Sequence, residues 1–134
     1  MTKLFVYGTL RQQCRANHLI ERAQFLGFGR VRAKLVYVDH YPGLIKSETE
    51  WTRGELYQVD NDHLDELDQY EGCYECPPHY LRKKIVVEMD SGSMLDSEGY
   101  IFQKLDSRIH PPIEGNDWLT YINQNPKLNT FDHD

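Results

Sequence analysis

Hydrophobic and polar residues alternate in several short stretches of the chain, and a spacing of two is typical of β-strands. The first stretch, Lys3–Tyr7, is rich in β-branched and aromatic residues and ends at Gly8. The same criteria predict further strands at Gln24–Val31, Ala33–Val38, Trp51–Val59, Leu81–Met89 and Glu98–Phe102. Gly54 lies inside one of them, where a glycine indicates a bulge or a close approach of another backbone.

The spacing of three and four residues, which is typical of amphipathic helices, occurs in other segments. One predicted helix covers Arg15–Ala23, and a short one covers Trp118–Ile122 after a turn at residues 114–117. The apolar face of the first consists of Ala16, Leu19, Ile20 and Ala23.

A third helix is predicted at Asp60–Tyr70. Asp60 or Asn61 can cap its first turn, and Gly72 supplies the backbone freedom that commonly ends a helix. The residues expected to face the core are Leu64 and Leu67.

Short strands with few helices, not strictly alternating, predict a mixed α/β (α+β) domain. The pattern alone does not choose between a barrel and an open sheet. Tyr41-Pro42-Gly43 predicts a turn, and residues 90–97 predict a polar connection between strands. We expect one domain over residues 1–124, followed by a tail, 125–134, that has little to bury and frays.

Composition restricts the class of protein. The chain has 134 residues, with 40% hydrophobic and 27% charged, as in an ordinary globular domain. Its formal net charge is −6, from 15 Lys and Arg against 21 Asp and Glu, and the basic residues are scattered. Because this balance repels a phosphate backbone, we expect no nucleic acid partner.

We expect neither membrane insertion nor secretion. No segment is apolar over the length that spans a bilayer, and the apolar run before Gly8 is too short for a signal peptide. Three cysteines, an odd number, argue against a secreted disulfide scaffold. A cytoplasmic protein is therefore predicted.

The segment Gln69–Cys76 contains two candidate chemistries. Cys73 and Cys76 have a Cys-x-x-Cys spacing, but a structural zinc site needs four ligands and the six histidines are isolated in the sequence. A redox pair would open a helix, whereas this pair is expected in a loop. We interpret the two cysteines as incidental and expect no metal and no cofactor.

Glu71 is the other candidate. At the end of a helix the dipole disfavours an anion, and burial would add to this effect and raise the glutamate pKa toward the range useful for proton transfer. The turn Gly8-Thr9-Leu10 after the first strand offers backbone N–H groups to an anion. For each motif alone, a solvated glutamate or an empty turn is the simpler interpretation.

Together the motifs resemble those of a known family. They are, in order, FVYGTL, YPGL, GELY, LDQYEG, YLR and GNDW. From Lys3 to about Tyr121 the chain is similar to the gamma-glutamylcyclotransferase-like family, which includes the gamma-glutamylamine cyclotransferases. The resemblance implies a small mixed β-barrel with flanking helices and a cavity at one end.

The resemblance also implies a cofactor-independent enzyme acting on a small gamma-glutamyl molecule. In the family, the Tyr-Gly-Ser/Thr-Leu loop binds the glutamyl moiety and the glutamate of Tyr-Glu-Gly is the catalytic acid/base. The matching residues here are Glu71 for catalysis and Tyr7, Gly8, Thr9 and Leu10 for substrate binding.

The implied reaction cyclises a gamma-glutamyl amide or amine to 5-oxoproline and releases the amine. The alternative is a non-catalytic small-molecule-binding or interaction protein that keeps the fold and the pocket. A pocket too narrow for a gamma-glutamyl group, or a Glu71 that faces solvent, would favour this alternative. The identity of the amine and the oligomeric state do not follow from the sequence.

Overall fold

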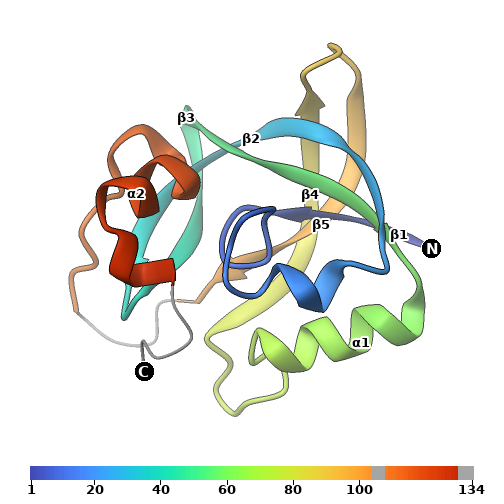
Figure 1. Cartoon of the computed structure of the whole chain (residues 1–134), viewed down its shortest axis with the longest axis horizontal. Coiled ribbons are helices and arrows are strands. Elements are labelled where there is room, and N and C mark those ends of the chain that lie inside the picture. The colour runs from blue at the N-terminus through green and yellow to red at the C-terminus, as the bar shows by residue number, and fades with distance from the viewer. Residues whose placement is uncertain (104–107, 130–134) are drawn as a thin grey trace.

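The computed structural model of the chain describes residues 1–103 and 108–129. Within these ranges five strands form a closed barrel in the order β1-β3-β2-β4-β5, flanked by two α-helices (Figure 1). The bounds are β1 Thr2–Val6, β2 Gln24–Val38, β3 Tyr41–Val59, α1 Asn61–Tyr70, β4 Tyr80–Met89, β5 Met94–Phe102 and α2 Trp118–Gln124. The predicted mixed α/β class and the barrel implied by the resemblance are both confirmed.

β1 closes the barrel, because it pairs antiparallel with β3 and parallel with β5. Its alternate side chains enter two different cores. Leu4 and Val6 pack in the cluster that includes residues of α1, whereas Phe5 and Tyr7 pack in the cluster that includes residues of α2. The end of β1 is therefore fixed from both sides, and this fixes the start of the loop that follows.

Gly54 shows the close approach that the sequence predicted. It pairs with Gly29 of β2, and a Cβ atom on it would lie 2.4 Å from the Phe5 ring and 2.5 Å from the Val6 carbonyl oxygen. A side chain there would push β1 away from β3, so the position requires glycine.

The hairpin of β2 and β3 turns at Asp39 and His40, whose φ angles are 46° and 76°. Two successive positive φ angles are the pattern of a two-residue type I′ turn. The turn predicted at Tyr41-Pro42-Gly43 is wrong, because these residues begin β3 and Tyr41 pairs with Val38. Aspartate and histidine tolerate positive φ better than most residues, but the proline and glycine gave the stronger sequence signal.

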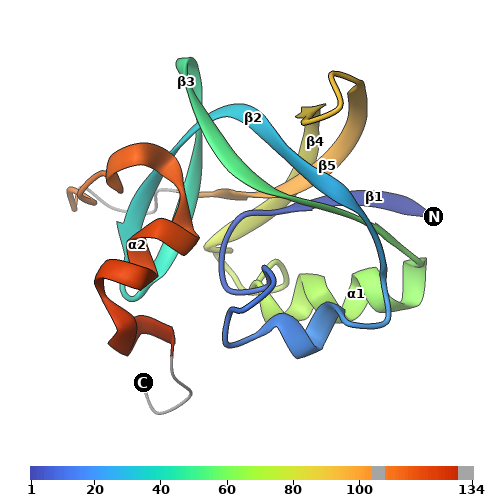
Figure 2. The same cartoon turned by 45° about the horizontal axis from the view of Figure 1, so that its top comes forward.

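β2 is one continuous strand rather than the two that were predicted (Figure 2). The register of its pairing with β3 shifts between Arg32, opposite Trp51, and Ala33, opposite Lys46. Residues 47–50 of β3 consequently bulge out of the pairing. β5 is also longer than predicted, since only residues 90–93 form the turn before it.

The helix predicted at Arg15–Ala23 is reduced to a 3₁₀ helix, Asn17–Ile20. The N–H of Asn17 donates to the Cys14 carbonyl, three residues back, at 3.1 Å. The N–H of Ala16 donates to the Thr9 carbonyl at 3.0 Å, so a contact with the loop replaces an α-helical bond. The apolar face was predicted correctly, because Ala16 and Ile20 are buried.

α1 begins as predicted. The side chain of Asp60 accepts a hydrogen bond of 2.8 Å from the N–H of His63, and Leu64 and Leu67 are buried. α2 is capped by Asp117. No helix in 1–103 or 108–129 is long and apolar enough to cross a membrane.

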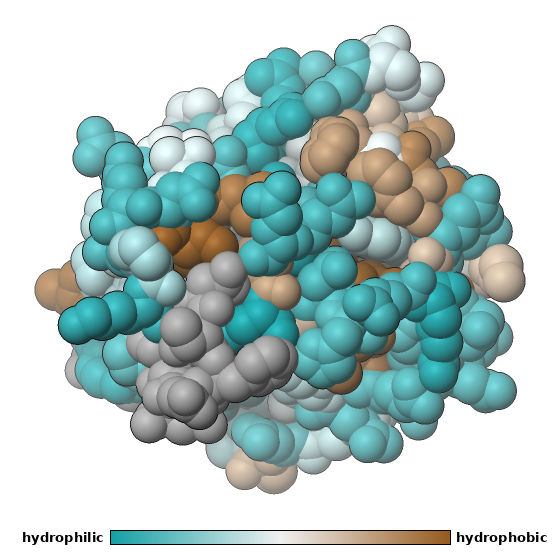
Figure 3. Space-filling view, viewed as in Figure 1, coloured by the Kyte–Doolittle hydropathy of each residue, from teal (hydrophilic) through white to brown (hydrophobic). Residues whose placement is uncertain are grey.

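Residues Pro126–Asn129 form a further 3₁₀ turn. The predicted fraying of residues 125–134 remains a prediction, because 130–134 lie outside the described residues. On the face shown in Figure 3, hydrophilic side chains predominate and apolar ones form separate small groups.

Candidate active site

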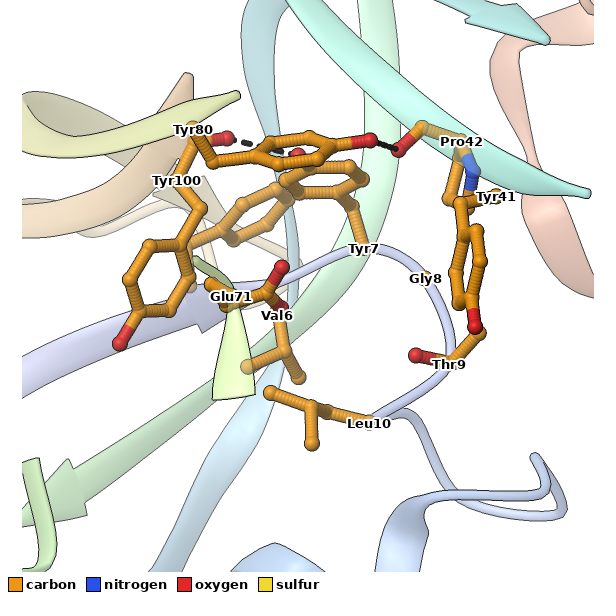
Figure 4. A pocket seen from close by; sticks show the side chains of 11 residues that line it. Val6, Tyr7, Gly8, Thr9, Leu10, Tyr41, Pro42, Glu71, Tyr80 and Tyr100 are labelled. Atoms are coloured by element: carbon orange, nitrogen blue, oxygen red, sulfur yellow. Dashed lines mark hydrogen bonds between the residues drawn. The ribbon is translucent and has the colours of Figure 1, made fainter. Parts of the chain in front are cut away.

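The five site residues singled out in the sequence line one pocket at the end of β1. Figure 4 shows the loop from Tyr7 to Leu10 curving around one side of this space, with the carboxylate of Glu71 facing it. The complete lining is Phe5, Val6, Tyr7, Gly8, Thr9, Leu10, Tyr41, Pro42, Glu71, Tyr80 and Tyr100.

The end of α1 positions Glu71. Gly72 has a φ of 76°, and its N–H donates to the Gln69 carbonyl at 3.1 Å. The N–H of Cys73 donates to the Asp68 carbonyl at 3.0 Å, which completes a Schellman motif. Glu71 is therefore the C-cap residue of α1, at the end of the helix as predicted, and the chain turns sharply away just after it.

The pKa of Glu71 is raised from its ordinary value of 4.5 to about 8. Burial is the larger cause, because it disfavours the charged carboxylate, and the negative charge of Asp68 adds to it. At neutral pH the carboxyl group is mostly protonated, yet it lies close enough to ionisation to accept and return a proton.

Asp68, one turn before Glu71, is buried within a network of its own. Arg82 donates two hydrogen bonds to its carboxylate, at 2.9 and 3.0 Å, and Tyr100 donates a third at 2.7 Å. Arg82 also pairs with Glu98. The network ties α1 to β4 and β5 and holds a negative charge beneath Glu71.

The tyrosines around the pocket use their hydroxyl groups to hold its walls. Tyr7 donates to the Tyr100 carbonyl at 2.6 Å, and Tyr80 donates to the Pro42 carbonyl at 2.9 Å. Tyr70 and Thr9 share a hydrogen bond of 2.9 Å. Burial raises the pKa of Tyr7, Tyr70 and Tyr80, so these hydroxyls remain protonated at neutral pH.

A buried ion-pair network anchors the other end of the loop. Arg11 donates to Glu55 at 3.0 Å and to Asp117 at 2.7 Å. Glu55 is fully buried and also accepts from the Gln12 N–H and the Tyr57 hydroxyl, each at 2.9 Å. The loop is thus tied to both β3 and the start of α2.

Among the described residues, the structure gives no hydrogen-bond acceptor for the backbone N–H groups of Gly8, Thr9 and Leu10 in this loop. Gly8 is required by packing, since a Cβ atom there would lie 2.6 Å from Pro42 Cγ. Its φ is not positive, so packing rather than backbone conformation explains the glycine.

Gly8→Ala is expected to destabilise the fold by about 1–3 kcal/mol through this clash and to weaken ligand binding. Thermal unfolding and ligand titration measure the two effects. Pro42→Ala in the same chain removes the clashing atoms and should recover part of the loss. A Gly8→Ala variant with wild-type stability and affinity would place the ligand elsewhere.

The pocket has a small inner chamber and a wider outer recess. The chamber holds about 40 Å³ of space, and the recess holds about 240 Å³. Tyr41, Glu71 and Tyr80 line both, so Glu71 lies where the two meet. The recess is completed by Tyr70, Gly72, Glu75 and His79.

Cys73 and Cys76 lie in the loop after α1, as predicted. Cys73 is partly buried, and burial followed by the charge of Asp68 raises its pKa to about 11, so it is not a thiolate at neutral pH. Among the described residues, no group of three or more His, Cys, Asp or Glu could hold a metal ion.

We expect Cys73→Ser with Cys76→Ser to leave thermal stability and any activity unchanged. Elemental analysis of protein purified without added metal should find no stoichiometric zinc. A bound metal lost from the double variant, together with a lower melting temperature, would restore the zinc interpretation.

Several motifs had no role assigned from the sequence. In the structure, one residue of each lines the pocket or holds a residue next to it. Pro42 of YPGL contacts Gly8, Glu55 of GELY and Asp117 of GNDW hold Arg11, and Arg82 of YLR holds Asp68. The order of these motifs along the chain was the sequence signal for them, but this order does not indicate which residues are in contact.

The fold and site define a small α/β barrel with a carboxyl group of raised pKa in a pocket at one end. A family model described as gamma-glutamyl cyclotransferase, AIG2-like, matches residues 4–120. The chain belongs to this family.

Two relatives and one solved structure illustrate the similarity. The gamma-glutamylcyclotransferase family protein YtfP of Escherichia coli is 32% identical over 118 residues, which cover 87% of this chain and 96% of YtfP. Gamma-glutamylaminecyclotransferase A of Danio rerio is 29% identical over 127 residues, which cover 87% of this chain and 73% of that protein. The crystal structure of an AIG2-like protein of Mus musculus superposes on this chain with a TM-score of 0.69 at 26% sequence identity. The superposition covers 85% of this chain and 86% of the mouse protein.

Proposed function

We propose that the protein is a gamma-glutamylcyclotransferase-type enzyme that converts a gamma-glutamyl amide or amine to 5-oxoproline and releases the amine. The observation that carries the proposal is the position of Glu71, with a pKa of about 8, in the same pocket as the loop Tyr7–Leu10. Family membership and the names of the relatives support the same reaction class.

In this proposal the loop binds the glutamyl end of the substrate. The N–H groups of Gly8, Thr9 and Leu10 would donate to its α-carboxylate. The inner chamber has room only for these terminal atoms, so the gamma-carbonyl would lie beside Glu71 and the leaving amine in the outer recess. The tyrosine rings of the recess would contact the amine.

Glu71 would move one proton during the reaction. The α-ammonium group of the substrate, with a pKa near ~8, must lose a proton before it can attack the gamma-carbonyl carbon. The Glu71 carboxylate would accept this proton and return it to the leaving nitrogen as the amide bond breaks and the ring bond forms. The second proton, which the attacking nitrogen loses on becoming the ring amide, would pass to the departing amine, which leaves as an ammonium ion. The loop would hold the substrate in the folded conformer that this attack requires.

The small inner chamber, about 40 Å³, is the observation that favours a non-catalytic binding protein. A screen of gamma-glutamyl amino acids, gamma-glutamyl amines and glutathione for release of 5-oxoproline separates the two functions. The enzyme should turn over at least one class. Binding of a compound without any product from the panel would support the alternative.

The pH dependence should report Glu71. Because the base must be ionised, the rate should fall as the pH decreases below about 8. Asp68→Asn removes the negative charge that adds to the effect of burial on the Glu71 pKa, so the midpoint of the variant's rate profile should move to lower pH. Ionisation of the substrate amine is common to both enzymes and cancels in the comparison.

Glu66→Gln serves as the control for this pH profile. Glu66 is an exposed residue of the same helix, paired only with the exposed Arg22 among the described residues. The midpoint of the pH–rate profile of Glu66→Gln should match that of the wild type. An unshifted midpoint in Asp68→Asn would mean that the profile reports another group.

A further inference from the structure

A second hollow, with a volume of about 620 Å³, lies away from Glu71. It shares no lining residue with the pocket or its outer recess. In Figures 1 and 2, the bulge of β3 and the turn between β4 and β5 project on the same side of the barrel, with β2 passing between them. This hollow, the β2–β4 cleft, is lined by residues of all four strands.

The cleft exists because β2 and β4 separate early. In the described register they pair only at Gly29 with Met89 and at Arg30 with Glu88. Beyond these pairs, apolar side chains of the barrel interior form the floor of the cleft. They are Val31, Ala33, Leu44, Ile85 and Ile101. At its edge, Val86 and Met94 are 49% and 58% exposed.

The polar part of the cleft is cationic, although the whole chain has a net charge of −6. Arg32, Lys46 and Lys84 line it, against the single acid Glu48. Neither lysine forms an ion pair with any residue that the structure describes. Two unneutralised ammonium groups beside an apolar floor favour an anion that carries an apolar body.

Trp51 forms one wall and is held in place. The guanidinium groups of Arg30 and Arg32 lie 4.0 and 4.1 Å from the centre of its ring. Stacked cations of this kind fix the orientation of an indole. The side chain is partly exposed, so it is available to an occupant of the cleft.

We propose that the β2–β4 cleft binds a small molecule with an apolar body and a carboxylate. The body would cover the apolar floor, and the carboxylate would lie near Lys46 and Lys84. The volume is within the range of small-molecule sites, which are mostly apolar with a few placed polar groups. This site is independent of the reaction proposed for Glu71.

Decanoate is a suitable probe, and Trp51 is a built-in reporter. The chain has two tryptophans, and the other, Trp118, is 1% exposed. Decanoate should change the fluorescence of Trp51 saturably, and Trp51→Phe should abolish the change. Decyltrimethylammonium, which has the same chain and the opposite charge, should produce little change at equal concentration.

Charge variants test which groups bind the carboxylate, with calorimetry as the readout. Lys46→Glu combined with Lys84→Glu should weaken decanoate binding about tenfold or more, because attraction becomes repulsion at two positions. Lys83→Glu, an exposed neighbour that lines neither cleft nor pocket, should bind like the wild type. Glu71→Gln should also bind like the wild type.

Three outcomes would overturn the proposal. The first is the absence of decanoate binding, and the second is equal binding of the anionic and cationic probes. The third is a dimer in sedimentation that dissociates in Met94→Glu, since a second copy of the chain would then cover the cleft.

Discussion

Glu71→Gln is expected to retain affinity for gamma-glutamyl compounds and to lose turnover by about 10²–10⁴-fold. Glutamine keeps the size of the side chain and its hydrogen-bonding reach but cannot accept a proton. Because the folded protein holds the Glu71 carboxyl largely neutral, the neutral amide should disturb the pocket little. Calorimetric affinity and initial rates of 5-oxoproline release measure the two quantities separately.

Glu66→Gln is again the matched control, because it removes a carboxylate from the exposed face of the same helix. Its rate should equal that of the wild type. If Glu71→Gln turned over at the wild-type rate, Glu71 would not be the proton carrier. If it lost binding as completely as turnover, Glu71 would act in binding the substrate.

Arg11→Met is expected to have the largest effect on stability, a loss of about 3–5 kcal/mol in the free energy of unfolding. Arg11 is 3% exposed and Glu55 is fully buried, so removing the cation leaves an uncompensated buried carboxylate. Methionine keeps much of the apolar volume, which isolates the loss of charge. Urea unfolding measures the change.

The exposed pair of Arg22 and Glu66 provides the comparison for Arg11→Met. The two side chains are 58% and 66% exposed, and Arg22→Met should cost less than about 1 kcal/mol. Equal losses of unfolding free energy in Arg11→Met and Arg22→Met would mean that the buried network does not hold the loop.

The parts of the fold that the sequence predicted well are those set by local patterns. The two-residue spacing located the strands, and Asp60, the leucines and Gly72 located α1. Errors arose where a contact outside the local repeating pattern decides the structure. The bond from Ala16 to Thr9 is one example, and the bulge of β3 opposite Arg32 is another.

In the candidate site, too, residues in short sequence motifs were predicted and contacts between distant segments were not. Glu71 and the loop from Tyr7 to Leu10 lie in short motifs and were predicted from the resemblance of these motifs to the family, and the structure places them in one pocket. The partners of Arg11 were not predicted, because Glu55 and Asp117 lie 44 and 106 residues away in the chain. Only the closed barrel brings such residues together.

In the proposed reaction, the substrate's own α-amine attacks its gamma-carbonyl carbon. The most direct test uses a substrate of the screened class labelled with ¹⁵N at the α-amine, with products identified by mass spectrometry. We predict 5-oxoproline that carries the label in its ring and is released in equal amount with the amine, and we predict that Glu71→Gln forms it about 10²–10⁴-fold more slowly. Labelled glutamate in place of 5-oxoproline would show attack by water and would contradict the account.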